Sequence, residues 1–272
     1  MSGLEDEIRI LWAGAVAYML AGSISMYSVR RKNPPERAVL LLLSAGLVLH
    51  GIAIAMRWHR LGHGPFITMF EILSSNVWSL TLIFTLVYWR IRPIRPSAAL
   101  VLPILFVMLC WLLVSNPGKG FFPPTYDTSL LYIHILLGKI FMGSLVVAVG
   151  LAGVILLRKG GFRNSLARMP DDNSLEELAY RFMAIALVFD TLMLISGAIW
   201  AQDAWGRYWA WDSLESWSFV TWLLLGFAIH ARMTLRPVPA IAASMVCLVF
   251  ALAFLTFFGV PFISTAPHKG AI

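Results

Sequence analysis

Residues 130–157 read LLYIHILLGKIFMGSLVVAVGLAGVILL, a run in which apolar side chains stand at nearly every position. Apolar runs of 18 or more residues are long enough to cross the ~30 Å hydrocarbon core of a bilayer as an α-helix. Eight such runs follow one another along the chain, at about 8–29, 38–58, 67–89, 97–115, 130–157, 178–200, 217–235 and 238–258. The sequence therefore predicts an all-α fold, a polytopic membrane helix bundle with about eight transmembrane helices.

The composition and the lack of long polar segments favour a single membrane domain. Hydrophobic residues make up 59% of the chain and charged residues 13%, with a mean hydropathy of +0.78, which is typical of an integral membrane protein. No internal repeat stands out, so residues 1–272 are expected to form one integral-membrane domain. Cys110 and Cys247 lie inside apolar runs without a Cys-x-x-Cys spacing, which excludes a thiol oxidoreductase and a c-type cytochrome.

The basic residues predict the orientation of the helices. Of the 21 Lys and Arg residues, thirteen lie in the connections that follow the odd-numbered runs, and seven lie on the other side. Because cytoplasmic connections carry an excess of basic residues, both termini are expected on the external side of the membrane. This bias accounts for most of the net charge of +7, so no nucleic-acid partner is needed, whereas membrane lipid headgroups are compatible partners.

A tryptophan-rich block separates the sixth and seventh runs. Residues 200–222 read WAQDAWGRYWAWDSLESWSFVTW and hold six of the eleven tryptophans of the chain. The block is too polar to span a bilayer and too aromatic for an ordinary loop. An interfacial aromatic belt would be spread over many helix ends and would not need the interspersed acidic residues. Trp205 and Trp209 are four residues apart and would share one face of any helix formed there, which suits a platform for a porphyrin face.

The histidines fall into two levels of the predicted bundle. At 1.5 Å per residue, His50 lies roughly 18 Å from the inner end of its run, and His230 lies roughly 20 Å from the outer end of its run. A lone histidine inside the membrane often forms an interhelical hydrogen bond, but two at similar depth favour a pair of axial ligands to haem iron. The remaining four lie at or beyond the outer membrane surface: His59, His63, His134 and His268.

Residues 205–217, WGRYWAWDSLESW, resemble the WWD signature of the haem-handling protein superfamily, and the CcsA (ResC-like) family of cytochrome c biogenesis proteins is the best match within it. Residues 62–71, GHGPFITMFE, resemble the Gly-His-x-Pro…Glu segment of that family. His134 matches the first external histidine of the family, residues 230–232 match its His-x-Arg, and His268 falls where its second external histidine lies. The resemblance covers nearly the whole chain from about residue 50 onward.

Several positions depart from the pattern of the family. Ser213-Leu214 stands where Pro-Lys is usual, and Thr68 stands where Asn is common. The family often reads Leu-His-Ser-Tyr around its second external histidine, whereas this chain reads Ala-Pro-His-Lys around His268. His59 and His63 are therefore alternatives to His268.

The resemblance implies a function in system II cytochrome c biogenesis. Proteins of this family carry haem b, their substrate, through the membrane and present it at an external WWD site, where thioether bonds join it to the Cys-x-x-Cys-His motif of apocytochrome c. The implied partners are a CcsB (ResB-like) membrane subunit, with which such a chain forms a holocytochrome c synthase (haem lyase), and a thiol-reducing, thioredoxin-like protein. The implied location is the bacterial cytoplasmic (inner) membrane or the thylakoid membrane.

The resemblance also implies two pairs of axial ligands to the haem iron. His134 and His268 are expected to form the external pair. His230 is expected to belong to an inner pair, together with His50 or with a residue of the partner subunit. Two neutral imidazoles are a common way of holding haem iron.

Further side chains of the signature are expected to hold the rest of the haem. Asp212 is expected to orient a ligand histidine or a tryptophan N–H, and Arg207 to pair with a propionate, with Arg57 and Arg60 as alternatives. Glu71 is expected to snorkel to the membrane surface, to pair with one of these two arginines, or to support the haem site. Four tryptophans are expected to pack against the macrocycle: Trp205, Trp209, Trp211 and Trp217.

Three other functions compete with this interpretation. A di-haem electron-transfer protein would also use intramembrane histidine pairs, but in matched sets and without a role for the tryptophan block. A substrate transporter would show inverted halves and broken helices, and no such pseudo-repeat stands out. A membrane haem-binding regulator without synthase activity would share the same fold, so only a measurement of activity separates it from a haem lyase.

Overall fold

The computed structural model describes residues 2–29, 31, 34–162, 166–167 and 169–263. Within these residues all regular structure is helical, and eight helices are long and apolar enough to cross a membrane, which confirms the predicted all-α class and number of spans. The long helices are α1 (Ser2–Ser28), α2 (Glu36–Leu61), α3 (Met69–Arg90), α4 (Ala98–Val114), α5 (Ser129–Leu157), α6 (Asp172–Trp205), α7 (Ser213–Leu235) and α8 (Pro239–Phe254). The short segments are η1 (Arg92–Ser97), η2 (Pro124–Tyr126), η3 (Arg158–Phe162), η4 (Leu255–Gly259) and α9 (Val260–Ile263).

The chain divides into two compact units. The first unit comprises Met1–Gly120 with Gly160–Pro170, and it contains α1 to α4. The second unit comprises Phe121–Lys159 with Asp171–Ile272, and it contains α5 to α9. The prediction that residues 1–272 act as a single domain stays a prediction.

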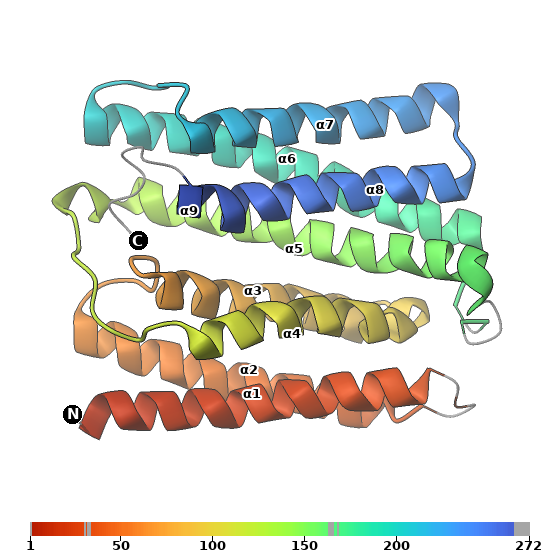
Figure 1. The fold of residues 1–272 in the computed structure, drawn as a ribbon, viewed down its shortest axis with the longest axis horizontal. Helices are drawn as coiled ribbons and strands as arrows, with labels where there is room; N and C mark the ends of the chain where they lie inside the picture. The colour runs from red at the N-terminus through yellow and green to blue at the C-terminus, as the bar shows by residue number, and fades with distance from the viewer. Residues whose placement is uncertain (1, 30, 32–33, 163–165, 168, 264–272) are drawn as a thin grey trace. The chain divides into compact units, whose positions relative to one another are not determined.

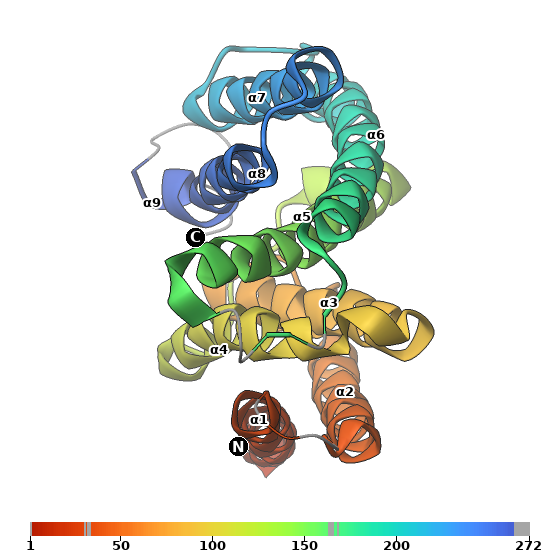
Figure 2. The ribbon, with the colours of Figure 1, turned by 90° about the vertical axis from the view of Figure 1, so that its right-hand side faces the viewer.

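In the first unit, close helix packing depends on small residues. Helix α1 packs against α2 and α4, and α3 packs against the same two helices (Figures 1 and 2). A Cβ on Gly46 of α2 would lie 2.5 Å from the ring of Tyr18, and one on Gly14 of α1 would lie 3.2 Å from the carbonyl oxygen of Gly46. Glycine at these two positions therefore lets the backbones of α1 and α2 approach, as small residues commonly do between membrane helices.

In the second unit, α6 and α8 contact each other and both remaining long helices, with α5 on one side of them and α7 on the other (Figure 2). Within the apolar 18-residue stretch of each span, 72% is buried in α5, against 28% in α6 and 22% in α7. A membrane helix that is largely covered by other helices can be apolar on all sides, which agrees with the long apolar run at residues 130–157.

The sixth helix is longer at both ends than the predicted run 178–200. Asp171 is its N-cap, and the side chain of Asp171 accepts hydrogen bonds from the backbone N–H groups of Asn173 and Ser174. The polar first turns are therefore helical, although they are too polar to count as membrane-spanning sequence. The helix ends at Trp205 because Gly206 adopts a left-handed conformation with φ of 71°.

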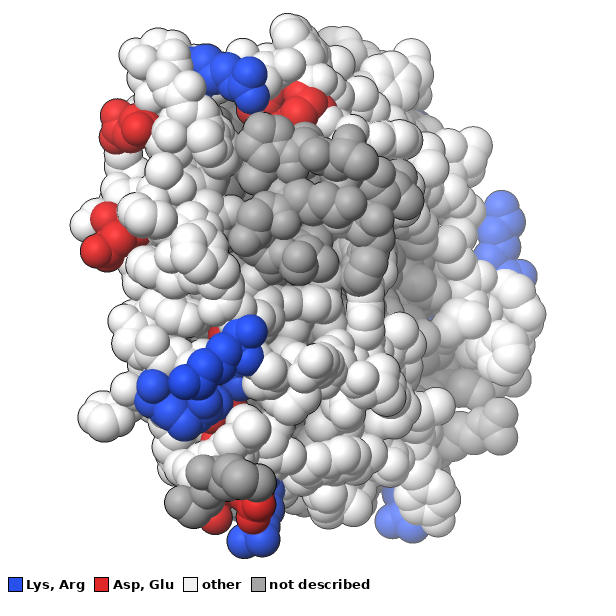
Figure 3. Space-filling view, turned by 60° about the vertical axis from the view of Figure 1, so that its left-hand side comes forward, with Lys and Arg blue, Asp and Glu red and all other residues white. Residues whose placement is uncertain are grey.

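The surface agrees with a membrane protein. On the face drawn in Figure 3, charged side chains form a few separate groups, and the other described side chains are uncharged. Large apolar side chains are exposed along several spans, for example Leu41 at 70% and Val107 at 63%. Exposed apolar surface of this kind is compatible with lipid contact.

Candidate functional site

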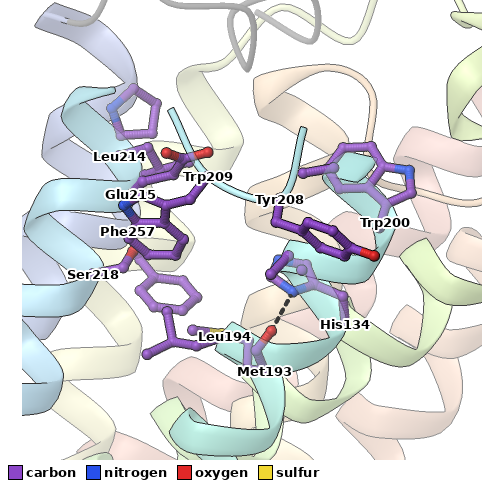
Figure 4. A pocket seen from close by; sticks show the side chains of 14 residues that line it. His134, Met193, Leu194, Trp200, Tyr208, Trp209, Leu214, Glu215, Ser218 and Phe257 are labelled. Atoms are coloured by element: carbon purple, nitrogen blue, oxygen red, sulfur yellow. Dashed lines mark hydrogen bonds between the residues drawn. The ribbon is translucent and has the colours of Figure 1, made fainter. Parts of the chain in front are cut away.

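A cavity of about 160 Å³ lies at one end of the second unit (Figure 4). Four parts of the chain meet there: the start of α5, the end of α6, the connection to α7 with its first turns, and the segment after α8. The polar or aromatic side chains that line the cavity are His134, Trp200, Tyr208, Trp209, Glu215, Ser218 and Phe257.

His134 is fixed in orientation by its neighbours. Its Nδ1 lies 2.9 Å from the backbone oxygen of Met193, shown as the dashed line in Figure 4. Because a carbonyl oxygen can only accept, Nδ1 carries the proton of a neutral ring, and Nε2 carries the lone pair that can bind a metal. The ring stacks on Trp200 with centroids 6.3 Å apart and planes at 27°. A Cβ on Gly197 would lie 2.8 Å from the His134 ring, so only glycine leaves the ring this position.

Trp200 is the base on which His134 stacks. Its indole is 4% exposed, and its Nε1 donates a hydrogen bond of 3.0 Å to the backbone oxygen of Thr125. Tyr126 and Trp205 pack edge-on against it, with ring centroids 5.4 Å and 4.9 Å away. Burial also raises the pKa of Tyr126, so its hydroxyl stays neutral. The wall behind His134 is therefore an ordered aromatic cluster.

The connection between α6 and α7 separates the signature tryptophans. Trp205 ends α6, and α7 begins only at Ser213, so no helix contains both Trp205 and Trp209. The expectation that these two residues share a helical face is wrong, because the left-handed Gly206 stops the helix between them. Trp209 instead lies edge-on to Trp211, with centroids 5.7 Å apart and planes at 80°.

Asp212 is the N-cap of α7. Its Oδ1 accepts a hydrogen bond of 2.9 Å from the backbone N–H of Glu215, and the Oε2 atom of Glu215 accepts one of 2.7 Å from the backbone N–H of Ala210. Trp211, between these groups, has φ of 57°. The role that the structure gives to Asp212 is thus to begin a helix and to fix the chain that carries Trp209 and Trp211.

A second cavity of about 520 Å³ lies between α6 and α7. It is lined by Thr191 and three aliphatic side chains of α6 and by Trp209, Trp211, Phe219 and Trp222. Leu194, Ala198 and Trp209 line both cavities. Trp209 is therefore part of the wall between the cavity at His134 and this apolar groove.

Of the predicted site residues, the structure brings only some together. His134 and Trp209 line the first cavity, and Trp211 lines the groove. Arg207 and Trp217 are exposed and line neither cavity.

The other predicted ligands lie elsewhere or cannot be placed. His230 is exposed on α7. His50 is fully buried in the first unit, where its Nε2 lies 2.9 Å from the Ser74 hydroxyl. His59 and His63 also belong to the first unit. His268 lies outside the described residues.

The pairing predicted for Glu71 is confirmed. Arg57, which is 3% exposed, pairs with Glu71 at 3.0 Å and with Glu7 at 2.9 Å. Arg60 pairs with the other oxygen of Glu7 at 2.7 Å. Both arginines therefore hold carboxylates of the protein itself.

Several residues of the site were not predicted, among them Ser218 and Phe257. Trp200 and Tyr208 stood inside the tryptophan block without an assigned role, and nothing in the sequence marked Gly197. Glu215 had a readable signal, since an Asp with a Glu three residues later is the spacing of a capping box.

Comparisons with known proteins identify the family of the chain. Residues 37–268 match the profile of the family described as Cytochrome C assembly protein. The Cytochrome c biogenesis protein CcsA of Prochlorococcus marinus (strain MIT 9301) is 29% identical over 276 residues, which cover 90% of this chain and 88% of the relative. The protein of the same description from Chlamydomonas reinhardtii is 25% identical over 202 residues, which cover 71% of this chain and 57% of the relative.

A solved structure shares the fold. The protein named Cytochrome c Heme Lyase CcmF superposes with a TM-score of 0.72 at 18% identity, over 95% of this chain and 47% of CcmF. The chain thus spans about half the length of CcmF, and the likeness concerns the fold. Since the family profile covers most of the sequence, the chain belongs to the cytochrome c assembly protein family and is a CcsA-like integral membrane protein of cytochrome c biogenesis.

Proposed function

We propose that the chain carries haem b, as its substrate, through the membrane and presents it beside His134 for attachment to apocytochrome c. The observation that carries this proposal is the oriented imidazole of His134 in the wall of an aromatic cavity, which is lined in part by the tryptophan-rich signature. The Nδ1 of His134 donates to the Met193 carbonyl at 2.9 Å, so the lone pair of the neutral ring, which would bind iron, is on Nε2. The family membership, and relatives described as cytochrome c biogenesis proteins, support a role in cytochrome c biogenesis.

The proposed ligand set extends the predicted one. His134 is one external axial ligand, and His268 is the second, with His59 and His63 as alternatives. Inside the membrane His230 binds iron, with His50 or a residue of a CcsB-like partner opposite it. The buried contact of His50 with Ser74 favours the partner for this position.

The aromatic residues would hold the macrocycle. Trp209 would pack against its face, Trp211 and Trp217 would cover its edge, and Trp205 supports the wall through Trp200. Arg207 is exposed beside the site and suits a propionate, because a guanidinium binds carboxylates in a bidentate manner.

The attachment step requires positioning more than acid–base chemistry. Each thioether forms when a cysteine S–H adds across a haem vinyl group, so nothing leaves and no net redox change occurs. The histidine of the acceptor motif replaces one external ligand of the iron. Holding vinyl groups and thiols together is the contribution of the protein, and the thioredoxin-like partner keeps the thiols reduced. The distribution of basic residues supports an external site, in the bacterial inner membrane or the thylakoid membrane.

The test is the absorption spectrum of the protein purified with its CcsB-like partner from haem-supplied cells. We expect a Soret band of a six-coordinate haem in the wild type. His134→Gly should lose the part of this band that comes from haem at the external site, and added imidazole should restore it. His59→Gly and His63→Gly serve as matched controls, and whichever of them copies His134→Gly is the second ligand in place of His268. A colourless wild-type complex would overturn the proposal.

A second assay separates the haem lyase from a haem-binding regulator or a di-haem electron carrier. The wild-type complex should mature a Cys-x-x-Cys-His acceptor, measured as haem that stays bound to the acceptor under denaturing conditions. A coloured complex that matures no acceptor but turns over quinol would assign the chain to electron transfer. A coloured complex with neither activity would make it a regulator.

A further inference from the structure

Glu215 was not among the predicted site residues, yet its carboxylate ties together the segment that carries the signature tryptophans. We propose that Glu215 is a positioning residue: together with Asp212 it closes a hydrogen-bonded clip that holds Trp209 and Trp211 in place before any ligand arrives. The identity of that ligand as haem rests on the proposed function. The clip itself rests on geometry alone.

The clip consists of hydrogen bonds on both sides of Trp211. The Ala210 N–H, which follows Trp209, donates to Glu215 Oε2 at 2.7 Å, and the Glu215 N–H donates to Asp212 Oδ1 at 2.9 Å. The Ser216 N–H donates to the backbone oxygen of Asp212 at 2.9 Å, and its hydroxyl donates to the backbone oxygen of Trp211 at 3.2 Å. The chain before and after Trp211 is therefore bound to the first turn of α7.

The backbone of Trp211 shows that the clip acts against a local preference. Its φ of 57° lies in the left-handed region, which residues with a Cβ rarely adopt. Such a conformation persists only where the surroundings hold it. Only one other described non-glycine residue, Arg236, has a positive φ. The clip is what fixes the left-handed turn at Trp211.

This turn decides where the two indoles stand. Trp209 lies in the wall between the cavity at His134 and the groove, whereas Trp211 lines the groove and is 66% exposed. Phe219 lies edge-on to both, with centroids 6.5 Å from Trp209 and 5.9 Å from Trp211. Because the Trp211 indole is largely exposed, few side-chain contacts hold it, and its position is set mainly by the backbone conformation.

The carboxylate of Glu215 acts here as a hydrogen-bond acceptor. Among the described residues no Lys, Arg or His side chain lies within ion-pair distance of it. The amide oxygen of a glutamine can accept the same N–H. Glu215→Gln should therefore preserve the clip, and Glu215→Ala should open it.

The first measurement needs no haem. Amide hydrogen exchange of residues 208–216 is compared among the wild-type complex, Glu215→Gln and Glu215→Ala. Loss of one hydrogen bond is expected to speed exchange about tenfold in Glu215→Ala and to leave Glu215→Gln near the wild type. The same exchange measurement on Asp212→Asn and Asp212→Ala repeats the comparison at the N-cap of α7. Exchange within α5 checks that each variant is folded.

The matched control is Asp171→Ala, which removes an equivalent N-cap at the opposite end of α6 from Trp205. It should leave exchange at residues 208–216 unchanged. The proposal is overturned if Glu215→Ala does not speed exchange there, or if Glu215→Gln behaves like Glu215→Ala, because the charge and not the acceptor would then matter.

The second measurement uses the haem-loaded complex and follows transfer of haem to apomyoglobin. Glu215→Ala should release haem about tenfold faster than the wild type, with Glu215→Gln and Asp171→Ala near the wild-type rate. Equal rates in all four would overturn the role in positioning for the ligand. A wild type that holds no haem but shows the exchange pattern would leave the clip standing and overturn the proposed function instead.

Discussion

Two helices of the molecule begin with the same device. At the start of α3, the Thr68 hydroxyl accepts a hydrogen bond from the Glu71 N–H at 3.3 Å, and Glu71 reaches back to the N–H groups of Ile67 and Thr68. At the start of α7, Asp212 accepts from the Glu215 N–H, and Glu215 reaches back to Ala210. Both are variants of the capping box, with a glutamate three residues after the cap.

The surroundings of the two glutamates differ. Glu71 is fully buried and paired with Arg57, whose other donors reach Glu7 and the backbone oxygens of Pro117 and Gly118. Glu215 lines a cavity and pairs with no described cation. The same cavity is lined by Trp209, whose buried Nε1 has no hydrogen-bond partner among the described residues. The capping box of α3 is part of a buried cluster of ion pairs, which we call the saturated cluster. The capping box of α7 borders the His134 cavity, where the Trp209 Nε1 can still bind a ligand, and we call this side of the cavity the open wall.

The largest expected effect is at the saturated cluster. Arg57→Ala would leave the buried carboxylate of Glu71 without its cation and that of Glu7 with Arg60 alone. Breaking a buried pair in this way costs about 3–5 kcal/mol. Denaturant unfolding of the detergent-solubilised protein, followed by circular dichroism, measures this loss. Arg60→Ala is the control, because Arg60 is 26% exposed and should cost far less. A stable Arg57→Ala would mean that the cluster is not what holds these helix ends.

The two glutamates can be compared directly by the same substitution. Glu71→Gln should cost about 2–3 kcal/mol, because a buried charged hydrogen-bond partner of Arg57 is lost. Glu215→Gln should cost less than about 1 kcal/mol, because the amide can still accept from Ala210. The same unfolding assay serves both variants. Equal losses would remove the distinction between a saturated cluster and an open wall.

The sequence predicted what depends on local pattern. The apolar runs predicted all eight spans, and the tryptophan block contained three of the aromatic residues that line the His134 cavity. The start of α6 was missed because hydropathy does not register a polar but well-capped first turn. The pairing of Glu71 with Arg57 or Arg60 was among the expectations, but the contact of Arg57 with Glu7, which spans 50 residues, was not. The contact of His134 with Met193 spans 59 residues, and such contacts arise only from tertiary packing.

Substitution of two glycines tests whether the open wall can accommodate an added methyl group better than the saturated cluster can. A methyl on Gly120 would lie 2.7 Å from Ile67 and 2.8 Å from Thr68, whereas a methyl on Gly197 would lie 2.8 Å from the His134 ring. Gly120→Ala should cost about 1–3 kcal/mol of stability, as overpacking does, without changing a haem spectrum.

Gly197→Ala should cost less, at or below about 1 kcal/mol, because the His134 ring can swing into the adjacent cavity. The haem spectrum should then change, since His134 would lose its alignment with the Met193 carbonyl. Unfolding and absorption measured on both variants give the comparison. A spectral change in Gly120→Ala, or none in Gly197→Ala, would contradict it.

The smallest effect is expected at a third cap, Asp171, which has a carboxylate like Asp212 but stands in solvent. The Ser174 hydroxyl, at 2.7 Å, and the backbone N–H of Ser174 lower the pKa of Asp171. A carboxyl whose folded pKa lies below its unfolded value stabilises the fold above the ordinary carboxyl pKa of about 3.9, and this contribution is lost as pH falls through the folded pKa. Exchange of the first turn of α6, corrected for the intrinsic effect of pH, should therefore rise in acid. Asp171→Asn caps the helix without titrating, so its exchange should stay flat. If exchange in Asp171→Asn rose in acid as it does in the wild type, another titrating group would be responsible. The charge of Asp171 would then contribute nothing to this cap.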